Sequence, residues 1–298
     1  MADSAPTAWH RAAVAASGLA LGWVFWPTLQ AVADRWADDP RYSHGYLVPL
    51  FSAYLLWARR GRLAGSPDHR HWLGFPLLAA GLAARGAGVT FHVEWAAAAA
   101  LLPCLAGLAL LWGGRRGLAW AGPAIAFLVF MVPLPYRVEV ALAHPLQRVA
   151  TAASTYALQT LGVLAVAEGN TIRLGGGIRL GVVEACSGLS MLVVFFALAT
   201  AAAVVVRRPV YERLLLVASA VPIALAANVA RITVTGVLHK TAGSEIADRV
   251  FHDLAGWLMM PLALVLMWAE LAVLGRLIVD TSAPLPARAD RPAATPGS

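Results

Sequence analysis

Residues 187–208 read SGLSMLVVFFALATAAAVVVRR, a run with no charged side chain up to Val206 that is followed directly by Arg207 and Arg208. An uninterrupted apolar helix of about 20 residues crosses the hydrocarbon core of a bilayer, which is about 30 Å thick. An arginine pair at the end of such a run is typical of the cytoplasmic boundary. This segment therefore predicts a transmembrane helix that starts on the outer side, near Ser187.

The composition extends this prediction to the whole chain. Hydrophobic residues make up 59% of the sequence and charged residues 13%, whereas about a quarter of the residues in a soluble domain are charged. We predict an all-α polytopic membrane protein with about eight transmembrane helices. Two of the predicted spans are short and depend on their neighbours, namely 44–58 and 118–132. The other six are 11–31, 72–91, 95–112, 187–206, 211–236 and 253–275.

Loop charges give the predicted orientation. With eight spans, the arginine-rich loop 59–70 and the pairs Arg115–Arg116 and Arg207–Arg208 fall on one side together with both termini. Clustered arginine marks the cytoplasmic side, so we expect a multi-pass protein of the bacterial inner (plasma) membrane with cytoplasmic termini. The net charge of +7 then reports topology, and we expect no nucleic-acid partner.

The ends of the chain leave two expectations. Ala31-Val32-Ala33 mimics a signal-peptidase site, but its apolar run is longer than a signal h-region of about 7–15 residues, which favours an uncleaved anchor over a cleaved signal. Residues 1–280 are expected to form a single integral-membrane domain. Residues 281–298, rich in Ala, Pro and Arg, are expected to be a disordered cytoplasmic tail.

The longest stretch between spans, about 133–186, is expected on the periplasmic side. Pro133, Pro135 and Pro145 disfavour a continuous helix at its start. Gln147–Val163 mixes polar and apolar residues at helical spacing, which predicts a helix in the membrane interface. Thr171–Leu174 and 178–180 alternate with period two around three glycines, which predicts a short β-hairpin before the cysteine-bearing helix.

Three polar residues lie at the outer ends of predicted spans, where a polar side chain usually has a structural or functional role. Cys186 begins the sixth span, Arg231 lies in the outer third of the seventh, and His252 begins the eighth. An intramembrane arginine is costly and usually functional. A cysteine attacks as the thiolate, which a helix N-terminus and a nearby cation favour. His252 could move the proton and Arg231 could bind an oxyanion, so the trio predicts a thiol-peptidase centre that faces the periplasm.

Other residues near the trio could support it. Glu184, Asn228 and Asp253 could orient the three side chains, although Asp253 could equally cap its helix. His44 and Ser43 lie at the same outer level and could line a substrate groove. Ser187 is an alternative nucleophile, but it lacks the GxSxG elbow.

The cysteine count limits the remaining chemistry. Cys104 and Cys186 are the two cysteines of the chain, and neither belongs to a CxxC motif, so we expect no metal and no cofactor. Cys104 lies mid-span and is expected to be a small apolar filler. A thiol-redox protein would need the two cysteines to pair, which would require Cys104 to leave the middle of the membrane.

Several sequence blocks together resemble the exosortase/archaeosortase family. The blocks are Ala185-Cys186-Ser187-Gly188-Leu189, Asn228-Val229-Ala230-Arg231-Ile232 and Phe251-His252-Asp253 with Gly256-Trp257, preceded by Tyr42-Ser43-His44-Gly45 and Asn170-Thr171-Ile172. By this resemblance Cys186 is the nucleophile, Arg231 positions or stabilises, and His252 is the acid/base. The resemblance runs from about residue 20 to residue 275.

The same resemblance implies a cysteine-type peptidase or transpeptidase (a hydrolase of the thiol-protease type) that acts in protein sorting. Its substrates would be membrane-anchored exported proteins whose C-terminal signal comprises a recognition motif (PEP-CTERM type), one transmembrane helix and a basic cluster. The acyl group would pass to water or to an acceptor amine, which the family links to exopolysaccharide. The subfamily, the recognition motif and the oligomeric state stay open. A non-catalytic transporter or exopolysaccharide-assembly subunit is the alternative, and it predicts polar groups along a path through the bilayer.

Overall fold

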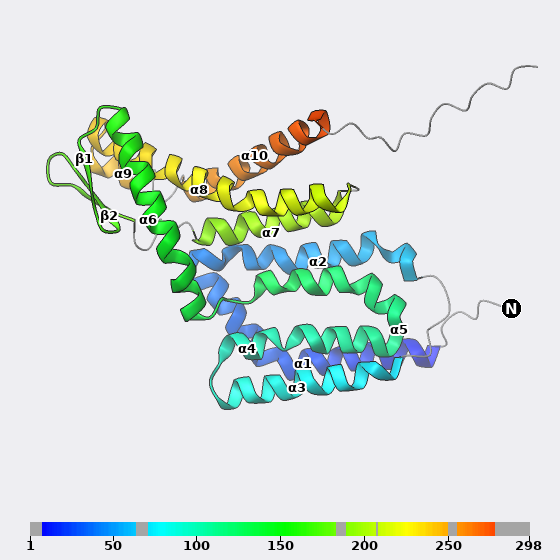
Figure 1. The fold of residues 1–298 in the computed structure, drawn as a ribbon. Helices are drawn as coiled ribbons and strands as arrows, with labels where there is room; N and C mark the ends of the chain where they lie inside the picture. Colours follow the sequence, from blue (N-terminus) through cyan, green and yellow to red (C-terminus); the bar gives the residue numbers. More distant parts are fainter. Residues whose placement is uncertain (1–7, 64–70, 183–188, 207, 250–254, 278–298) are drawn as a thin grey trace, which may run out of the picture.

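A computed structural model of the chain describes residues 8–63, 71–182, 189–206, 208–249 and 255–277, and these are almost entirely helical. Figure 1 shows the elements. The helices are α1 (Ala8–Asp38), α2 (Leu47–Ala58), α3 (Gly74–Thr90), α4 (Glu94–Ala99), α5 (Leu101–Phe127), α6 (Tyr136–Thr160), α7 (Leu189–Val205), α8 (Val210–Thr241), α9 (Ser244–Arg249) and α10 (Ala255–Leu277). Short 3-10 helices are η1 (Pro40–Tyr46), η2 (Arg60–Leu63), η3 (His71–Leu73) and η4 (Leu128–Met131).

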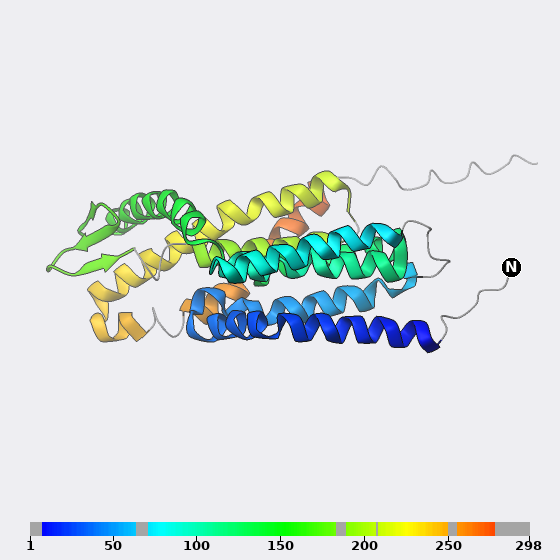
Figure 2. The ribbon, with the colours of Figure 1, turned by 90° about the horizontal axis from the view of Figure 1, so that it is seen from below.

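The long helices run side by side, and the two ends of the bundle differ (Figures 1 and 2). At one end α1 begins, α2 ends and α7 passes to α8. The opposite end carries η1. At this end α6, α9 and a small β-sheet project beyond the bundle. Arg59, Arg60 and the pair Arg115–Arg116 lie at the first end. This distribution is the one that the positive-inside rule describes.

Helix α5 contains a sharp reversal at Gly114. That residue has φ 60° and ψ −157°, which is not helical, and glycine adopts such a conformation readily because it has no Cβ. The reversal separates the predicted spans 95–112 and 118–132, so α5 is two helical segments. Gly117 lies close to the Ala109 carbonyl across this hairpin, and an added Cβ would approach that oxygen to 2.5 Å.

Within the described residues, each predicted span falls largely on helix, but the helices differ in length. Among the residues that the structure describes, four helical stretches are long and apolar enough to cross a membrane, namely Ala8–Asp38, His71–Thr90, Glu94–Met131 and Val210–Thr241. Met191–Val205 and Leu264–Val273 are shorter apolar helices, and α2 has 12 residues. The polytopic all-α character is therefore present, and the count of eight spans stays a prediction.

Helices α3 and α5 pack at very short range through glycine. Gly74, Gly81 and Gly88 recur at every seventh position of α3 and are buried. A Cβ on Gly81 would lie 2.5 Å from the Cys104 Sγ, and one on Gly74 would lie 2.5 Å from the Gly107 carbonyl oxygen. Cys104 is fully buried in this seam, as expected for a small filler. Small residues that let backbones approach are a usual feature of membrane helix pairs.

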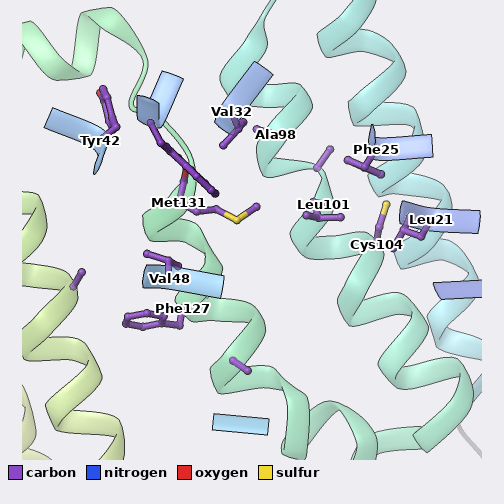
Figure 3. Close-up of a cluster of buried hydrophobic side chains, with 14 of the residues drawn as sticks. Leu21, Phe25, Val32, Tyr42, Val48, Ala98, Leu101, Cys104, Phe127 and Met131 are labelled. Carbon is purple, nitrogen blue, oxygen red and sulfur yellow. The ribbon is translucent and has the colours of Figure 1, made fainter. Parts of the chain in front are cut away.

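The largest apolar cluster joins α1, η1, α2, α5, η4 and α7 (Figure 3). Figure 3 shows Phe25 and Leu21 beside Cys104 at one side of the cluster, and Val48, Phe127 and Met131 at the other. The Trp36 Nε1–H donates to the Met131 carbonyl at 3.1 Å. The cluster thus fixes the end of the bundle at which η1 and η4 meet.

The segment after the fifth span corrects part of the sequence prediction. The helix predicted over Gln147–Val163 is α6, which begins at Tyr136 and continues through Pro145 to Thr160. Pro145 removes one backbone hydrogen bond, but it lies within α6 and does not end the helix. Pro135 precedes the helix as its N-cap residue and so does not interrupt it.

A three-stranded antiparallel sheet follows α6, in the order β1 (Ala165–Glu168), β2 (Thr171–Leu174), β3 (Arg179–Gly181). The predicted hairpin is β2–β3, with Ile172 opposite Leu180. Strand β1 was not predicted, and it pairs Glu168 with Thr171. Gly169 at the β1–β2 turn has φ 63°, and Asn170 has no positive φ, as in the type II′ turns that join paired strands.

Candidate active site

Arg231 occupies a defined depth along α8. The helix has 32 residues, which corresponds to about 48 Å at 1.5 Å per residue. Arg231 follows Val210 by about 32 Å along the axis, close to the 30 Å thickness of a hydrocarbon core. If α8 enters the bilayer near Val210 and stands close to its normal, the guanidinium lies at the opposite boundary.

The outer part of α8 presents a polar face. Asn228, Arg231, Thr235 and His239 are spaced by three or four residues and so share one face of the helix. Asn228 is fully buried, Thr235 and His239 are buried, and Arg231 is partly buried. The Thr235 hydroxyl donates to the Arg231 carbonyl at 2.9 Å. Asn228 therefore lies one turn before Arg231, where the sequence prediction placed it as a supporting residue.

Helix α6 meets this face with polar residues of its own. Gln147, Thr151, Ser154 and Thr155 are buried, whereas large apolar residues of α6 such as Leu142, Val149 and Tyr156 are exposed. The amphipathic helix thus turns its polar side inward. Ser154 Oγ lies 3.5 Å from the Val229 carbonyl oxygen, so α6 packs on α8 at Val229, beside the face that carries Asn228 and Arg231.

Gly236 allows a third element to join α6 and α8. A Cβ at this position would lie 2.7 Å from one methyl carbon of Leu158 on α6 and 3.4 Å from a Leu180 methyl on β3. One apolar cluster therefore contains residues of α6, the sheet and α8. Val182, which follows β3, belongs to it together with Val229 and Ile232. Val182 thus packs in one cluster with Ile232, which follows Arg231, and with Val229, which precedes Arg231 by two positions.

Several predicted site residues lie outside the residues that the structure describes. These are Cys186 and His252, with Glu184, Ser187 and Asp253 of the supporting set. The described elements nearest to them in sequence are α7, α9 and α10, and all three pack against α8. The convergence of Cys186, Arg231 and His252 accordingly stays a prediction.

His44 lies in a packed environment. Its side chain is 4% exposed, and its Nε2 lies 3.2 Å from the Phe130 carbonyl oxygen. Its neighbour Gly45 is required for packing, because a Cβ there would lie 2.3 Å from the Trp36 Nε1. Ser43 beside it is exposed, and η1 contacts α7. Helix η1, which carries His44, thus contacts α1 and α2 as well as α7. A direct role of His44 with substrate stays a prediction.

Sequence reasoning missed one residue of this region, Gln147. Its side-chain oxygen accepts a hydrogen bond from Asn170 Nδ2 at 2.9 Å. The available signal was the recurrence of Gln147, Thr151 and Ser154 on one helical face. That spacing predicts an interfacial helix, but it does not show that the polar face packs against another helix. Among the described residues, no group of three His, Cys, Asp or Glu side chains gathers in a way that could hold a metal ion.

Comparison with known proteins identifies the family. No curated protein and no solved structure matched the chain. The family model described as transmembrane exosortase matches residues 36–269, which is more than half of the sequence. The match includes the α8 site, the sheet and η1. The chain belongs to the transmembrane exosortase family.

Proposed function

We propose that this exosortase is a cysteine peptidase or transpeptidase of the bacterial inner membrane, with Cys186, Arg231 and His252 as its catalytic residues. It cleaves the C-terminal sorting signals of exported proteins near the periplasmic face of the membrane. Family membership supports a membrane-anchored protein substrate in the bilayer. The observation that carries the proposal is the position of Arg231, about 32 Å along α8 on a buried polar face.

The chemistry of the proposed reaction follows from the three side chains. The Cys186 thiolate attacks the carbonyl carbon of the scissile peptide bond, and the carbonyl oxygen becomes an oxyanion. Arg231 donates N–H groups to this oxyanion, since a guanidinium keeps its charge in a protein. His252, protonated by the thiol, returns the proton to the leaving amine nitrogen. A thioester remains on Cys186.

The thioester is resolved by a second nucleophile. Water or an acceptor amine attacks the thioester carbonyl carbon, His252 takes the proton, and the thiolate leaves. The product is a free carboxylate with water and a new amide with an amine. An exopolysaccharide-linked acceptor is the candidate amine source for the transpeptidase branch.

The proposed orientation places both termini in the cytoplasm and the polar end of the bundle in the periplasm. Arginines at the opposite end of the bundle support it. Substrates that carry a transmembrane helix followed by a basic cluster would insert with the same orientation. Their scissile bond would then lie just outside that helix, at the height of Arg231.

Cleavage of a tagged substrate tests the proposal. The substrate is an exported protein that ends in a recognition motif, one transmembrane helix and a basic cluster, coexpressed with the exosortase. Wild type and Cys104→Ala should both release the shortened product, and Cys186→Ala should not. Equal cleavage by wild type and Cys186→Ala would refute the proposed mechanism. Membrane insertion of each variant is checked by fractionation.

A transporter is the alternative function, and it predicts polar groups along a path through the bilayer. One polar contact within the helical part of α8 and α10 favours it. Ser219 Oγ on α8 donates to Glu270 Oε2 on α10 at 2.6 Å. Ser219 Oγ also lies 2.8 Å from the Leu216 carbonyl oxygen. This polar contact lies twelve residues before Arg231 on α8 and does not itself connect with it. A transporter would retain its function in Cys186→Ala, so the same variant separates the two functions.

A further inference from the structure

We propose that Gln147 and Asn170 are positioning residues that hold the chain leading to Cys186 against α6 and α8. This inference rests on the proposed function, since it assigns a role in the same reaction. Gln147 is buried on the inward face of α6, with 4% of its surface exposed. Asn170 lies at the β1–β2 turn, and its Nδ2 donates to Gln147 Oε1 at 2.9 Å.

Asn170 makes a second contact through its backbone. Its carbonyl oxygen accepts the Val182 N–H at 2.9 Å. Asn170 thus contacts α6 through its side chain and Val182 through its main chain. Val182 follows β3 and precedes Cys186 by four positions. Val182 is 1% exposed and packs in the same cluster as Ile232. We call the chain of contacts Gln147–Asn170–Val182 the brace.

A second side-chain hydrogen bond joins the sheet to α6, in addition to the brace and the apolar cluster. At the other end of the sheet, Gln159 Nε2 donates to the Ala165 carbonyl at 2.8 Å. Ala165 pairs with Leu174, whereas Thr171, next to Asn170, pairs with Gly181. The Gln159 bond therefore holds the end of the sheet that is remote from Val182. Gln159 therefore supplies a control from the same helix and with the same side chain, at an exposed position.

The expected consequence of losing the brace is a change in catalytic rate. A misplacement of about 1 Å can cost about a hundredfold in rate. Gln147→Leu keeps the volume of the side chain and removes the acceptor. Asn170→Ala removes the donor and keeps the carbonyl that binds Val182. Each should lower kcat by about ten- to a hundredfold with little change in KM, whereas Gln159→Leu should leave kcat near that of wild type.

Two further variants distinguish positioning from general damage. Gln147→Glu retains an acceptor oxygen for Asn170 and should recover most of the rate lost in Gln147→Leu. The double variant Gln147→Leu/Asn170→Ala should be no slower than either single variant, because both remove one shared interaction. Additive losses in the double variant would overturn the brace.

A thiol readout tests the same inference without substrate turnover. In a Cys104→Ala background Cys186 is the sole cysteine. Its alkylation rate by a membrane-impermeant maleimide is measured against pH. The midpoint should lie below the value of about 8.5 for a free thiol and should move up towards it in Gln147→Leu and Asn170→Ala. In Gln159→Leu the midpoint should stay at that of the Cys104→Ala parent.

Different results would refute the proposed function and the brace. If Cys186→Ala cleaves substrate as wild type does, the proposed function is wrong. The brace then has no reaction of Cys186 to support and is wrong as well. If Cys186→Ala is inactive while Gln147→Leu matches Gln159→Leu in both kcat and alkylation profile, the proposed function survives. The brace is then wrong.

Discussion

The seam between α3 and α5 makes a sharp prediction about stability, because two glycines on one helix differ in what faces them. A Cβ on Gly81 would lie 2.5 Å from Cys104 Sγ and 3.0 Å from the Cys104 backbone nitrogen, whereas one on Gly86 would have nothing within 4 Å. Gly81→Ala therefore forces α3 and α5 apart, and Gly86→Ala does not. Both changes share the same gain in helix propensity, of about 1 kcal/mol.

The difference between the two variants isolates the packing cost. Overpacking a well-packed core costs about 1–3 kcal/mol, so Gly81→Ala should be less stable than Gly86→Ala by that amount. The free energy of unfolding is measured in mixed micelles by titration with a denaturing detergent, with helicity and tryptophan fluorescence as probes. Adding Cys104→Ala to Gly81→Ala removes the nearest atom and should restore part of the loss.

Two results would refute this reasoning. If Gly81→Ala and Gly86→Ala have equal free energies of unfolding, the helices do not approach as closely as described. If Cys104→Ala destabilises the Gly81→Ala variant by as much as it destabilises wild type, the Sγ contact is not the cause of the cost.

Other perturbations have equally direct outcomes. Gly45→Ala should displace the Trp36 ring and break its bond to the Met131 carbonyl, which costs about 2–5 kcal/mol when overpacking and a lost buried hydrogen bond are combined. The same detergent titration measures it, with Gly22→Ala, which has nothing within 4 Å, as the control. Arg231→Lys keeps the charge but loses the planar fork of donors, so substrate cleavage should fall at least tenfold, or about 1.4 kcal/mol of barrier, while insertion is unchanged. A rate equal to wild type would exclude a bidentate role for the guanidinium. Ser219→Ala leaves the Glu270 carboxylate without its donor between α8 and α10, which should lower stability by about 1–3 kcal/mol and leave cleavage intact.

The helices could be predicted from sequence because the bilayer imposes one strong requirement on each segment. Apolar runs located the long helices other than α6, and the reversal at Gly114 lies in the gap left between 95–112 and 118–132. Arg231 could be singled out for a related reason, since a charge at that depth is costly. In both cases a local property of the chain decides the outcome.

The segments outside the apolar runs depend on contacts that local sequence does not encode. Strand β1 reads Ala-Val-Ala-Glu, which has weak strand propensity, and it forms because β2 pairs with it across Gly169. Pro145 was interpreted as a helix breaker, but it lies on the exposed side of α6. Gln147 and Asn170 are 23 residues apart, and only the folded arrangement of helix and sheet brings them together.

The continuous length of α8 ties the height of the site to the thickness of the surrounding lipid. The helix begins at Val210 and continues through Pro222, and Arg231 lies about 32 Å further along its axis. Lipids with longer acyl chains would submerge that group, and shorter chains would lift it into water, at a modest energetic cost per Å of mismatch. Substrate cleavage in vesicles of graded chain length should therefore pass through a maximum. Its position would show which bilayer thickness this exosortase is matched to.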